Sequence, residues 1–293
     1  MNWQKSLKKR LKVNEPLKDK TTFRIGGQAQ FFAEPRDTDE LCSLVRFAKD
    51  NKIRVFILGA GSNILVDDAG LKGMVLRLSA PAFRSCTFEG SLARPKSGML
   101  LAQLIRKAQA HSLSGPENFI GIPGTVGGAL VMNAGAWGKS IGDLVEDVQV
   151  MDYNGLIKTF KKKEIKFSYR ASNLAKYIVL GATLRLERAD RDKVSATMKK
   201  FLAKRRQSQD NTLPNAGCIF KNPHNDSAGR LIDLCGLKGR CIGEAKISEK
   251  HANFMLNTGN ARTVDVLKLM CLARRCVKNK FKVDLKPEIK VWH

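Results

Sequence analysis

Residues 121–138 read GIPGTVGGALVMNAGAWG, and this stretch decides how the rest of the sequence is interpreted. It contains six glycines, one proline and no charged residue. Glycine lacks a Cβ, so it permits positive φ angles and close approach of main-chain N–H groups to a ligand. A buried structural turn is the simpler interpretation, and a membrane span is disfavoured because the glycines and Pro123 would leave backbone groups unsatisfied in lipid. The stretch indicates a loop whose backbone lies against a flat or phosphorylated ligand.

A second glycine-rich segment, residues 59–63, reads GAGSN and follows a buried-strand pattern at residues 54–58. A dinucleotide-binding fingerprint must open a helix. Here residues 64–66 look extended and Asp67-Asp68 looks like a turn, which disfavours a Rossmann fold. The segment is more typical of a nest of backbone N–H groups, with Ser62 and Asn63 as side-chain donors.

The remaining apolar patterns predict strands mixed with helices. Strands are expected at residues 29–33, 74–78, 145–151, 156–160 and 177–186, with Asn154-Gly155 as a hairpin turn. Helices are expected after Asp37 or Thr38, over 101–108, 194–202 and 227–235, and after Thr263 as an N-cap. The two blocks of this mixture predict an α+β protein with a domain boundary in the polar run at 187–192.

The chain is strongly basic, with 52 Lys and Arg against 27 Asp and Glu and a net charge of +25. A basic surface favours anionic partners such as nucleic acid, acidic membranes or phosphorylated small molecules. Neither a zinc-finger spacing nor an RNA-recognition pattern accompanies the charge. Most of it is therefore attributed to general composition, and neither a nucleic acid partner nor a membrane span is expected.

The cysteine pattern bears on compartment and on metals. Seven cysteines occur without a CxxC pair, and only four histidines accompany them, so no metal site is expected from spacing. Residues 1–20 hold seven basic and two acidic side chains with no apolar segment, unlike a secretion signal. Unpaired cysteines without such a signal indicate a reducing compartment, and a cytoplasmic location is expected.

Eight short segments provide a more specific comparison. They are TTFRIGG (21–27), LGAGSNILV (58–66), the stretch at 121–138, SYRAS (168–172), AGCIFKNP (216–223), AGRLIDLCGLKG (228–239), KHANF (250–254) and LKPEI (285–289). In this order they resemble the UDP-N-acetylenolpyruvoylglucosamine reductase family. Some members carry an inserted, tyrosine-bearing segment after the SYRxS motif, and the short spacing here is similar to the class without it.

The resemblance implies an FAD-binding domain of the vanillyl-alcohol-oxidase type at residues 1–188, with two lobes dividing near residue 80. It implies a substrate-binding domain at 189–293, whose last strand returns toward the active site. The implied activity is the reduction of UDP-N-acetylglucosamine-enolpyruvate to UDP-N-acetylmuramate in bacterial peptidoglycan synthesis. NADPH would be the hydride donor and non-covalently bound FAD the carrier. No protein partner is implied.

The same resemblance assigns three catalytic residues. Arg170 and Glu288 would lie at the enolpyruvyl carboxylate, where a fixed guanidinium can stabilise the charge that hydride addition creates. Cys218 would protonate C2, at a position where many family members carry serine. A thiol has an unperturbed pKa of about 8.5, so it donates a proton more readily than an alcohol does. We expect Arg170 to favour the thiolate and Glu288 the neutral thiol, leaving Cys218 a neutral acid.

Cofactor and substrate contacts are carried over in the same way. Those expected for FAD are Gly59, Gly61, Ser62, Asn63, Ile122, Gly124, Thr125, Gly127 and Gly128. Those expected for the UDP-sugar are Tyr169, Lys221 and Asn222. Arg230 and Lys238 have basic side chains that could contact phosphates, but a role as solvent-exposed surface residues is an equal alternative. Glu244 stands where the family more often has glycine.

Two other functions stay open on the sequence alone. One is another FAD-linked oxidoreductase of the same flavin fold, some of which attach FAD through histidine or cysteine; His111 precedes the 121–138 stretch. The motifs at 216–223 and 285–289 disfavour it. The other is a nucleic-acid-binding protein, which would bind with a steep salt dependence and would leave the glycine segments without a role.

Overall fold

The computed structural model describes residues 10–293. The first nine residues, on which part of the secretion-signal argument rests, lie outside the described residues. The chain divides into two compact units. Of the described residues, unit 1 comprises 10–13, Phe31–Ala60 and Gly73–Lys204, and unit 2 comprises Asn14–Gln30, Gly61–Lys72 and Arg205–His293.

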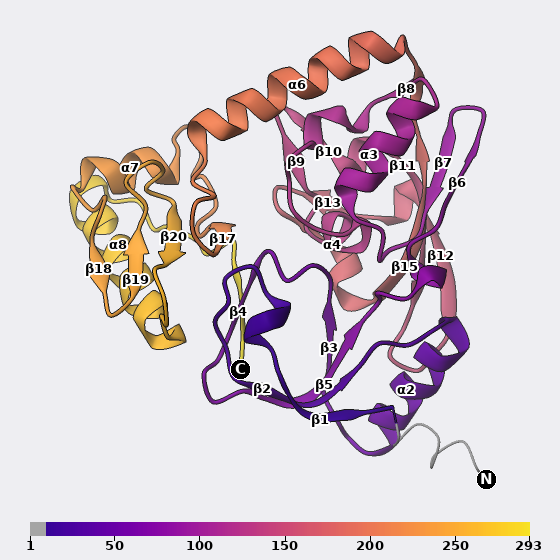
Figure 1. Ribbon diagram of the computed structural model, residues 1–293, viewed down its shortest axis with the longest axis horizontal. Helices are drawn as coiled ribbons and strands as arrows, with labels where there is room; N and C mark the ends of the chain where they lie inside the picture. The colour runs from indigo at the N-terminus through magenta and orange to yellow at the C-terminus, as the bar shows by residue number, and fades with distance from the viewer. Residues whose placement is uncertain (1–9) are drawn as a thin grey trace. The chain divides into compact units, whose positions relative to one another are not determined.

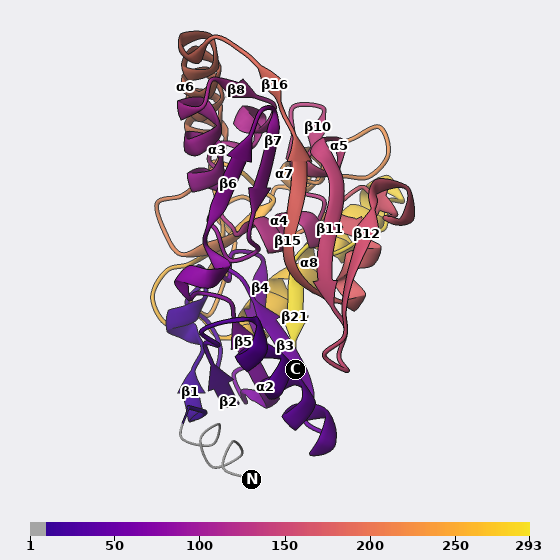
Figure 2. The same ribbon diagram turned by 90° about the vertical axis from the view of Figure 1, so that its right-hand side faces the viewer.

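A five-stranded antiparallel sheet lies at the centre of unit 1, in the order β12-β11-β15-β7-β6 (Figures 1 and 2). Its strands are β6 (Cys86–Glu89), β7 (Leu92–Pro95), β11 (Val145–Met151), β12 (Ile157–Lys161) and β15 (Ile178–Arg185). The Asn154-Gly155 hairpin is confirmed between β11 and β12. The Asp152 carboxylate closes it by accepting from the N–H groups of Asn154 and Leu156, both at 2.9 Å.

Helices cover this sheet because their apolar faces have the predicted spacing. Helix α3 (Leu101–Ala110) buries Leu101, Leu104, Ile105 and Ala108, as expected for one face of a helix. These side chains share a core with β11, β15 and the short helix α4 (Val126–Val131). Helix α6 (Arg191–Ser208) adds Val194 and Met198 to the same core.

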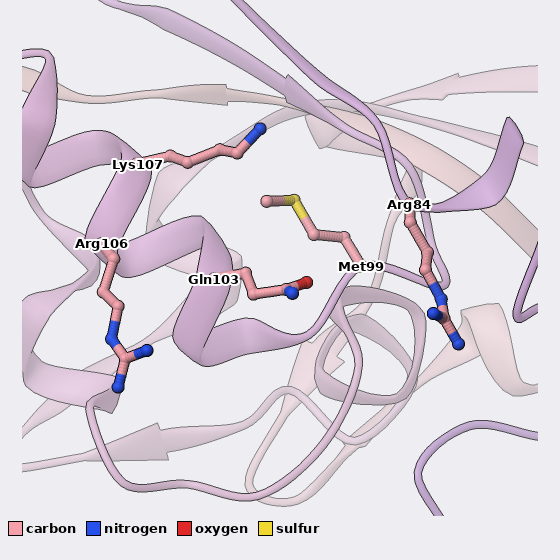
Figure 3. Close-up of a pocket in the computed structure, with 5 residues that line it drawn as sticks. All are labelled: Arg84, Met99, Gln103, Arg106 and Lys107. Carbon is pink, nitrogen blue, oxygen red and sulfur yellow. The ribbon is translucent and has the colours of Figure 1, made fainter. Parts of the chain in front are cut away.

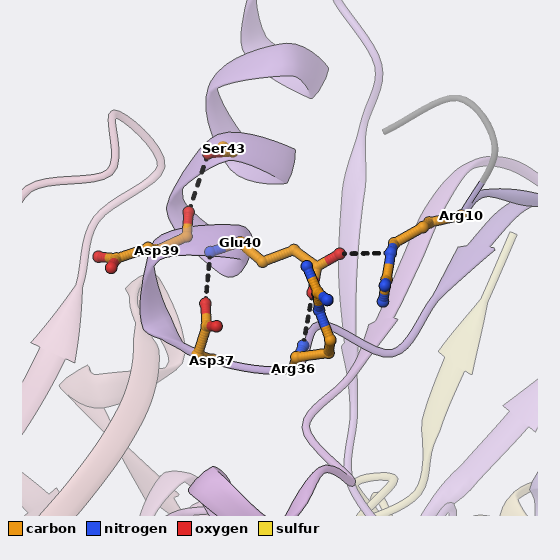
Figure 4. Close-up of polar contacts among 6 residues, drawn as sticks. All are labelled: Arg10, Arg36, Asp37, Asp39, Glu40 and Ser43. Atoms are coloured by element: carbon orange, nitrogen blue, oxygen red, sulfur yellow. Dashed lines mark hydrogen bonds and ion pairs between the residues drawn. The ribbon is translucent and has the colours of Figure 1, made fainter. Parts of the chain in front are cut away.

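Helix α2 (Thr38–Asp50) begins where its capping residue predicts (Figure 4). Asp37 is the N-cap and accepts from the Glu40 N–H at 2.8 Å. The buried Glu40 carboxylate reaches back to the Arg36 N–H at 2.8 Å and pairs with the guanidinium groups of Arg36 and Arg10. A buried charge is tolerated here because two cations and a backbone donor satisfy it.

A four-stranded sheet has the order β1-β2-β5-β3, and the division between the units passes through three of its strands. The strands are β1 (Lys12–Pro16), β2 (Gln28–Ala33), β3 (Val55–Leu58) and β5 (Leu71–Arg77). Strands β3 and β5 pair in parallel, in a register that joins Val55 to Met74 and Leu58 to Arg77. The predicted strands at 29–33, 54–58 and 74–78 are confirmed within a few residues.

Unit 2 contains a four-stranded sheet in the order β17-β20-β19-β18, with α7 and α8 beside it (Figure 1). The elements are β17 (Asn215–Cys218), α7 (Ala228–Leu234), β18 (Cys241–Ile242), β19 (Ala245–Ile247), β20 (Phe254–Asn257) and α8 (Thr263–Phe281). A separate parallel pair joins β4 (Ile64–Val66) to the C-terminal strand β21 (Lys290–Trp292). Leu65 and Phe23 thereby enter the same apolar core as α8.

The start of α8 differs from the sequence-based expectation. Thr263 is the first helical residue, not the N-cap. Its N–H donates to the Asp68 carboxylate at 3.0 Å, and its hydroxyl donates to the Val66 carbonyl. The partner of the first turn is thus a side chain from the distant 67–70 turn, which no local sequence pattern could indicate.

Short elements complete the described part of the chain. They are β8 (Leu113–Ser114), β9 (Gly135–Ala136), β10 (Lys139–Ser140), α5 (Ile141–Leu144), β13 (Phe167–Ser168), β14 (Ala171–Ser172), β16 (Glu187–Arg188) and 3₁₀ turns at Lys18–Lys20, Pro81–Phe83, Pro116–Phe119, Lys162–Glu164 and Asn173–Lys176. Of the helices within residues 10–293, none has both the length and the apolar character that crossing a membrane requires.

Candidate functional site

The glycine-rich stretch at 121–138 is not a loop throughout, because it contains α4. Thr125 is the N-cap of this helix, and its hydroxyl accepts from the Gly128 N–H at 3.3 Å. The N–H groups of Val126 and Gly127 donate to the carbonyls of Met99 and Ser97, both at 2.8 Å. These three N–H groups are satisfied inside the protein. The assignment of Gly127 and Gly128 to the cofactor therefore depends on close approach of the backbone, not on N–H donation.

Close packing explains why glycine stands at two of these positions. A Cβ on Gly59 would lie 2.8 Å from the Thr125 hydroxyl oxygen, and a Cβ on Gly127 would lie 2.9 Å from the Ser97 Cβ. The first contact brings the end of β3 against the N-cap of α4, so segments 59–60 and 121–128 meet within unit 1. The buried Ser97 hydroxyl beside them has no hydrogen-bond partner within the described residues. Sequence reasoning missed Ser97.

Arg170 lies in the turn of a short hairpin formed by β13 and β14. Its φ angle is 55°, in the left-handed region that non-glycine residues seldom adopt. Its guanidinium lies 5.3 Å from the centroid of the Tyr169 ring, and Tyr169 is 53% exposed. The predicted catalytic arginine and the predicted substrate contact are thus neighbours at an exposed turn. Backbone strain of this kind persists only where the surroundings hold the turn.

The residues that hold this hairpin come from the glycine-rich stretch. Asn133 donates from its amide to the Ser168 carbonyl at 3.1 Å and accepts from the Gly142 N–H at 3.1 Å. The Ser172 hydroxyl lies within hydrogen-bond distance of the Leu130 and Val131 carbonyls at the end of α4. Asn133 lies in the 121–138 stretch and Ser172 in the SYRAS motif, but the sequence assigned neither residue a role. The only signal for Asn133 was a polar side chain in an otherwise apolar stretch.

In unit 2, Thr22 of the TTFRIGG motif forms hydrogen bonds to Gly61, in the second half of the GAGSN segment, and to Asn215. The Thr22 N–H donates to the Gly61 carbonyl at 3.1 Å, and the Thr22 hydroxyl donates to the Asn215 carbonyl at 2.7 Å. Gly61 has a φ of +68°, and a Cβ there would overlap the Lys20 carbonyl. One threonine therefore connects Gly61 with the start of β17, the strand that ends at Cys218.

Cys218 and Glu288 lie on neighbouring segments of unit 2. The Glu288 N–H donates to the carbonyl of Ile219, the residue after Cys218, at 2.8 Å. The Asn63 amide donates to the Glu288 carbonyl at 3.3 Å, and the Lys290 N–H donates to the Asn63 carbonyl at 3.0 Å. The backbone of Glu288 is thus held both by Ile219, the residue after Cys218, and by Asn63, a predicted cofactor residue.

Asn253 organises the segment after Cys218. Its amide accepts from the Phe220 N–H at 2.9 Å and donates to the Phe220 carbonyl at 2.8 Å, and its own carbonyl accepts from the Ile219 N–H. Its neighbour His251 is largely buried, which lowers the pKa of the imidazole and favours its neutral form. Asn253 occurs in the KHANF motif, but sequence reasoning gave it no role.

The residues expected to contact the substrate, and the two basic residues considered for phosphates, form hydrogen bonds or ion pairs within the protein. The Lys221 N–H donates to the Lys286 carbonyl at 2.9 Å, and the Asn222 side chain accepts from the Ala228 N–H at the start of α7. Arg230 pairs with Asp226 at 2.5 Å and Lys238 with Asp233 at 2.6 Å, which favours the surface interpretation of both.

Two further positions raised in the sequence analysis have contacts inside the protein. The carboxylate of Glu244 accepts from the Asn260 N–H, so it links the turn at 243–244 to the bend at 259–260. The ring of His111 stacks on that of Phe88 at 4.2 Å, a packing role that needs no flavin attachment.

The candidate residues are divided between the two units. Unit 1 holds Gly59, Ile122, Gly124, Thr125, Gly127, Gly128, Tyr169 and Arg170. Unit 2 holds Gly61, Ser62, Asn63, Cys218, Lys221, Asn222 and Glu288. The proposed division into domains at residue 188 stays a prediction.

Comparisons with known proteins cover nearly the whole chain. Residues 29–161 match the model of an FAD binding domain, and residues 207–292 match that of the UDP-N-acetylenolpyruvoylglucosamine reductase C-terminal domain. The UDP-N-acetylenolpyruvoylglucosamine reductase of Caldanaerobacter subterraneus subsp. tengcongensis is 44% identical, over 96% of this chain and 93% of the relative. UDP-N-acetylenolpyruvoylglucosamine reductase 2 of Symbiobacterium thermophilum is 42% identical, over 97% and 92%.

A solved structure agrees with these sequence relatives. The UDP-N-acetylenolpyruvylglucosamine reductase of Thermus caldophilus has a TM-score of 0.82 and 36% identity, covering 97% of this chain and all of that one. The predicted α+β class with an FAD-binding domain is confirmed. The chain is an FAD-dependent oxidoreductase, and it belongs to the UDP-N-acetylenolpyruvoylglucosamine reductase family.

Proposed function

We propose that this protein reduces UDP-N-acetylglucosamine-enolpyruvate to UDP-N-acetylmuramate, with NADPH as hydride donor and non-covalently bound FAD as cofactor. The chain belongs to this family, and one structural observation is the main support for the proposal. The 2.8 Å hydrogen bond from Glu288 N–H to the Ile219 carbonyl joins the segment of Glu288 to the residue that follows Cys218. All seven cysteines are free thiols, which supports the proposed cytoplasmic location.

The residues of the two glycine segments fit a flavin. Stretch 121–138 carries no charge, and Gly59 lies so close to the Thr125 hydroxyl that a Cβ on Gly59 would come within 2.8 Å of it. Gly59, Ile122, Gly124, Thr125, Gly127 and Gly128 would hold the ring and the adenine-linked part, with the Ser97 hydroxyl as a further donor. Gly61, Ser62 and Asn63 would hold the pyrophosphate. When bound, FAD supplies the hydride chemistry, which no side chain of the protein can perform.

The protein's own contribution is charge stabilisation and a proton. The Arg170 guanidinium would bind the enolpyruvyl carboxylate and stabilise the negative charge that develops there. Its anchored hairpin gives it a fixed position, so little reorganisation is needed as the charge forms. Tyr169, Lys221 and Asn222 would orient the UDP-sugar.

Cys218 Sγ would donate its proton to C2 of the enol ether. The Glu288 carboxylate would disfavour the thiolate, while Arg170 would favour it. In this proposal the proton would stay on sulfur until hydride addition makes C2 basic.

Substitution of Cys218 tests the proton-donor role. In Cys218→Ala, bleaching of the flavin by NADPH should proceed at nearly the wild-type rate. Recolouring by the enolpyruvyl substrate should slow by roughly 10²–10⁴-fold, the usual contribution of a general acid. Stopped-flow absorbance measures the two half-reactions separately. Cys271→Ala, at an exposed cysteine of α8, is the matched control. Normal rates in both half-reactions of Cys218→Ala would exclude Cys218 as the acid.

A further inference from the structure

A cationic pocket in unit 1 is lined by residues to which no role in the proposed reaction has been assigned. Its volume is about 300 Å³, and it is lined by Arg84, Met99, Gln103, Arg106 and Lys107 (Figure 3). Figure 3 shows Gln103 and Lys107 extending from α3 toward Met99, with Arg84 on the segment opposite the helix. Three of the five lining side chains are cations, and none is a carboxylate.

The positive charge of this pocket is not neutralised inside the protein. Two other exposed arginines of unit 1 have acidic partners: Arg94 pairs with Glu89 at 2.6 Å, and Arg185 with Glu146 at 2.7 Å. Within residues 10–293, neither Arg84 nor Arg106 nor Lys107 forms an ion pair with a carboxylate. Three like charges around one concavity repel one another and attract an anion.

The Cys86 thiol, on which Lys107 acts, does not supply the missing charge. Lys107 acts on the Cys86 thiol, but burial outweighs it and raises the pKa of Cys86 to about 11. The thiol is therefore neutral at physiological pH and leaves the cations uncompensated.

The size and the wall of the pocket limit what it can hold. A volume of about 300 Å³ is at the lower end for small-molecule sites. The buried Met99 side chain provides an apolar floor, and the Gln103 amide can donate and accept. A phosphorylated small molecule meets these conditions, whereas a nucleic acid strand needs an extended basic groove with aromatic platforms.

The floor of the pocket is connected to the glycine-rich stretch. The Met99 carbonyl accepts from the Val126 N–H at 2.8 Å, and the Leu101 N–H donates to the Gly124 carbonyl at 3.0 Å. Residues Leu100 and Thr125 form a β-bridge between these two bonds. A ligand that moves Met99 would therefore act on the N-cap of α4, where Gly59 also packs.

We propose that this pocket binds a small anion carrying at least two negative charges, of the phosphate or diphosphate ester class, and that its occupancy is transmitted through Met99 to Thr125. The site is additional to the proposed reductase activity and does not depend on it. The α3 helix holds the pocket in place, because its opposite face is buried in the core of unit 1.

The test uses the flavin-loaded protein and inorganic pyrophosphate as the probe, in calorimetric titrations at constant ionic strength. In the double variant Arg84→Gln/Lys107→Gln, the Kd should rise about tenfold or more, since two exposed charge contacts are lost. The control Lys49→Gln, at an exposed lysine in the last turn of α2, should bind like the wild type. Pyrophosphate should also change the visible spectrum of the flavin in the wild type, and not in the double variant.

Three results would overturn the proposal. They are no binding by the wild type, an unchanged Kd in the double variant, and an equal loss in Lys49→Gln, which would indicate unspecific attraction by net charge. Pyrophosphate bound at any other site, including one for a nucleotide diphosphate, would not be weakened selectively at α3. If pyrophosphate binds but leaves the visible spectrum of the flavin unchanged, the proposed transmission from the pocket to Thr125 is refuted. Neither readout uses NADPH or the enolpyruvyl substrate, so the outcome is separate from that of the proposed function.

Discussion

Two buried asparagine side chains hold the segments that carry the proposed catalytic residues. Asn133, 8% exposed, holds the hairpin of Arg170, and Asn253, 1% exposed, holds the segment after Cys218. Asparagine suits both places because one amide both donates and accepts. The sequence did not identify either residue, since a lone asparagine is equally typical of an ordinary turn.

Asn133→Ala should affect one half-reaction selectively. It leaves the Ser168 carbonyl and the Gly142 N–H without partners, so we expect a loss of about 1–3 kcal/mol in the free energy of unfolding. A loosened Arg170 hairpin should raise the KM for the enolpyruvyl substrate several-fold, while NADPH bleaching stays near the wild-type rate. Urea unfolding and stopped-flow absorbance measure the two effects. Thr159→Ala, at an exposed position of β12, is the control. Destabilisation with an unchanged KM would show that Arg170 does not depend on Asn133.

At the scale of elements, α4 shows why the glycine stretch was predicted as a loop. Glycine in a helix interior costs about 1 kcal/mol relative to alanine, and this short helix contains Gly127 and Gly128. Tertiary contacts override that propensity. The first N–H groups find the Met99 and Ser97 carbonyls, and at Gly127 only glycine leaves room for Ser97. Such contacts join segments about thirty residues apart, so no local pattern reveals them.

Gly59→Ala tests the contact between the end of β3 and the N-cap of α4. The new Cβ would lie 2.8 Å from the Thr125 hydroxyl oxygen, so one of the two segments must shift. Overpacking of this kind costs about 1–3 kcal/mol, and we expect FAD to bind about tenfold more weakly or worse. Flavin fluorescence titration of the apoprotein measures the affinity. Gly90→Ala controls for general destabilisation by an added Cβ, because its φ of +57° makes the substitution strained although nothing lies within 4 Å of the new atom. Wild-type affinity in Gly59→Ala would remove Gly59 from the flavin site.

Asp210 anchors the loop that leads into β17, and its contribution should depend on pH. Burial raises the pKa of its carboxyl, but hydrogen bonds from Ser248 and Thr212 outweigh burial and hold the pKa below its usual range. A lowered folded-state pKa stabilises the protein fully above the unfolded value of about 3.9 and loses this effect as the pH falls through the folded value.

Asp210→Asn should therefore be less stable than the wild type by about 1–3 kcal/mol at pH 7, and the difference should shrink below about pH 4. Urea unfolding across pH measures both quantities. The control is Asp284→Asn, whose exposed carboxyl has its pKa lowered to about 2 by Lys286 and Arg274. Exposed pairs contribute little, so this variant should lose much less. A pH-independent difference for Asp210→Asn would mean that charge is not what anchors the loop.

At the scale of the whole molecule, local patterns predicted the elements but not their association. Strands β2, β3, β11 and β15 and helices α2, α3 and α7 lie within a few residues of their predicted places, because apolar periodicity is a local property. The division into units is not local. Residues 61–72 belong with 205–293, and β4 pairs with the last strand β21. The functional motifs were recognised by resemblance, whereas Thr22, Ser97, Asn133 and Asn253 acquired roles only through their partners in the fold.

The central claim is that this chain carries out an FAD-dependent reduction of an enolpyruvyl UDP-sugar with NADPH. The most direct measurement is the visible absorption of the purified protein under anaerobic conditions. We expect the spectrum of bound flavin, its bleaching by NADPH, and its recolouring when UDP-N-acetylglucosamine-enolpyruvate is added. A protein reconstituted with FAD that shows no bound-flavin spectrum, or a bleached protein that is recoloured by oxygen but not by the enolpyruvyl sugar, would contradict the account.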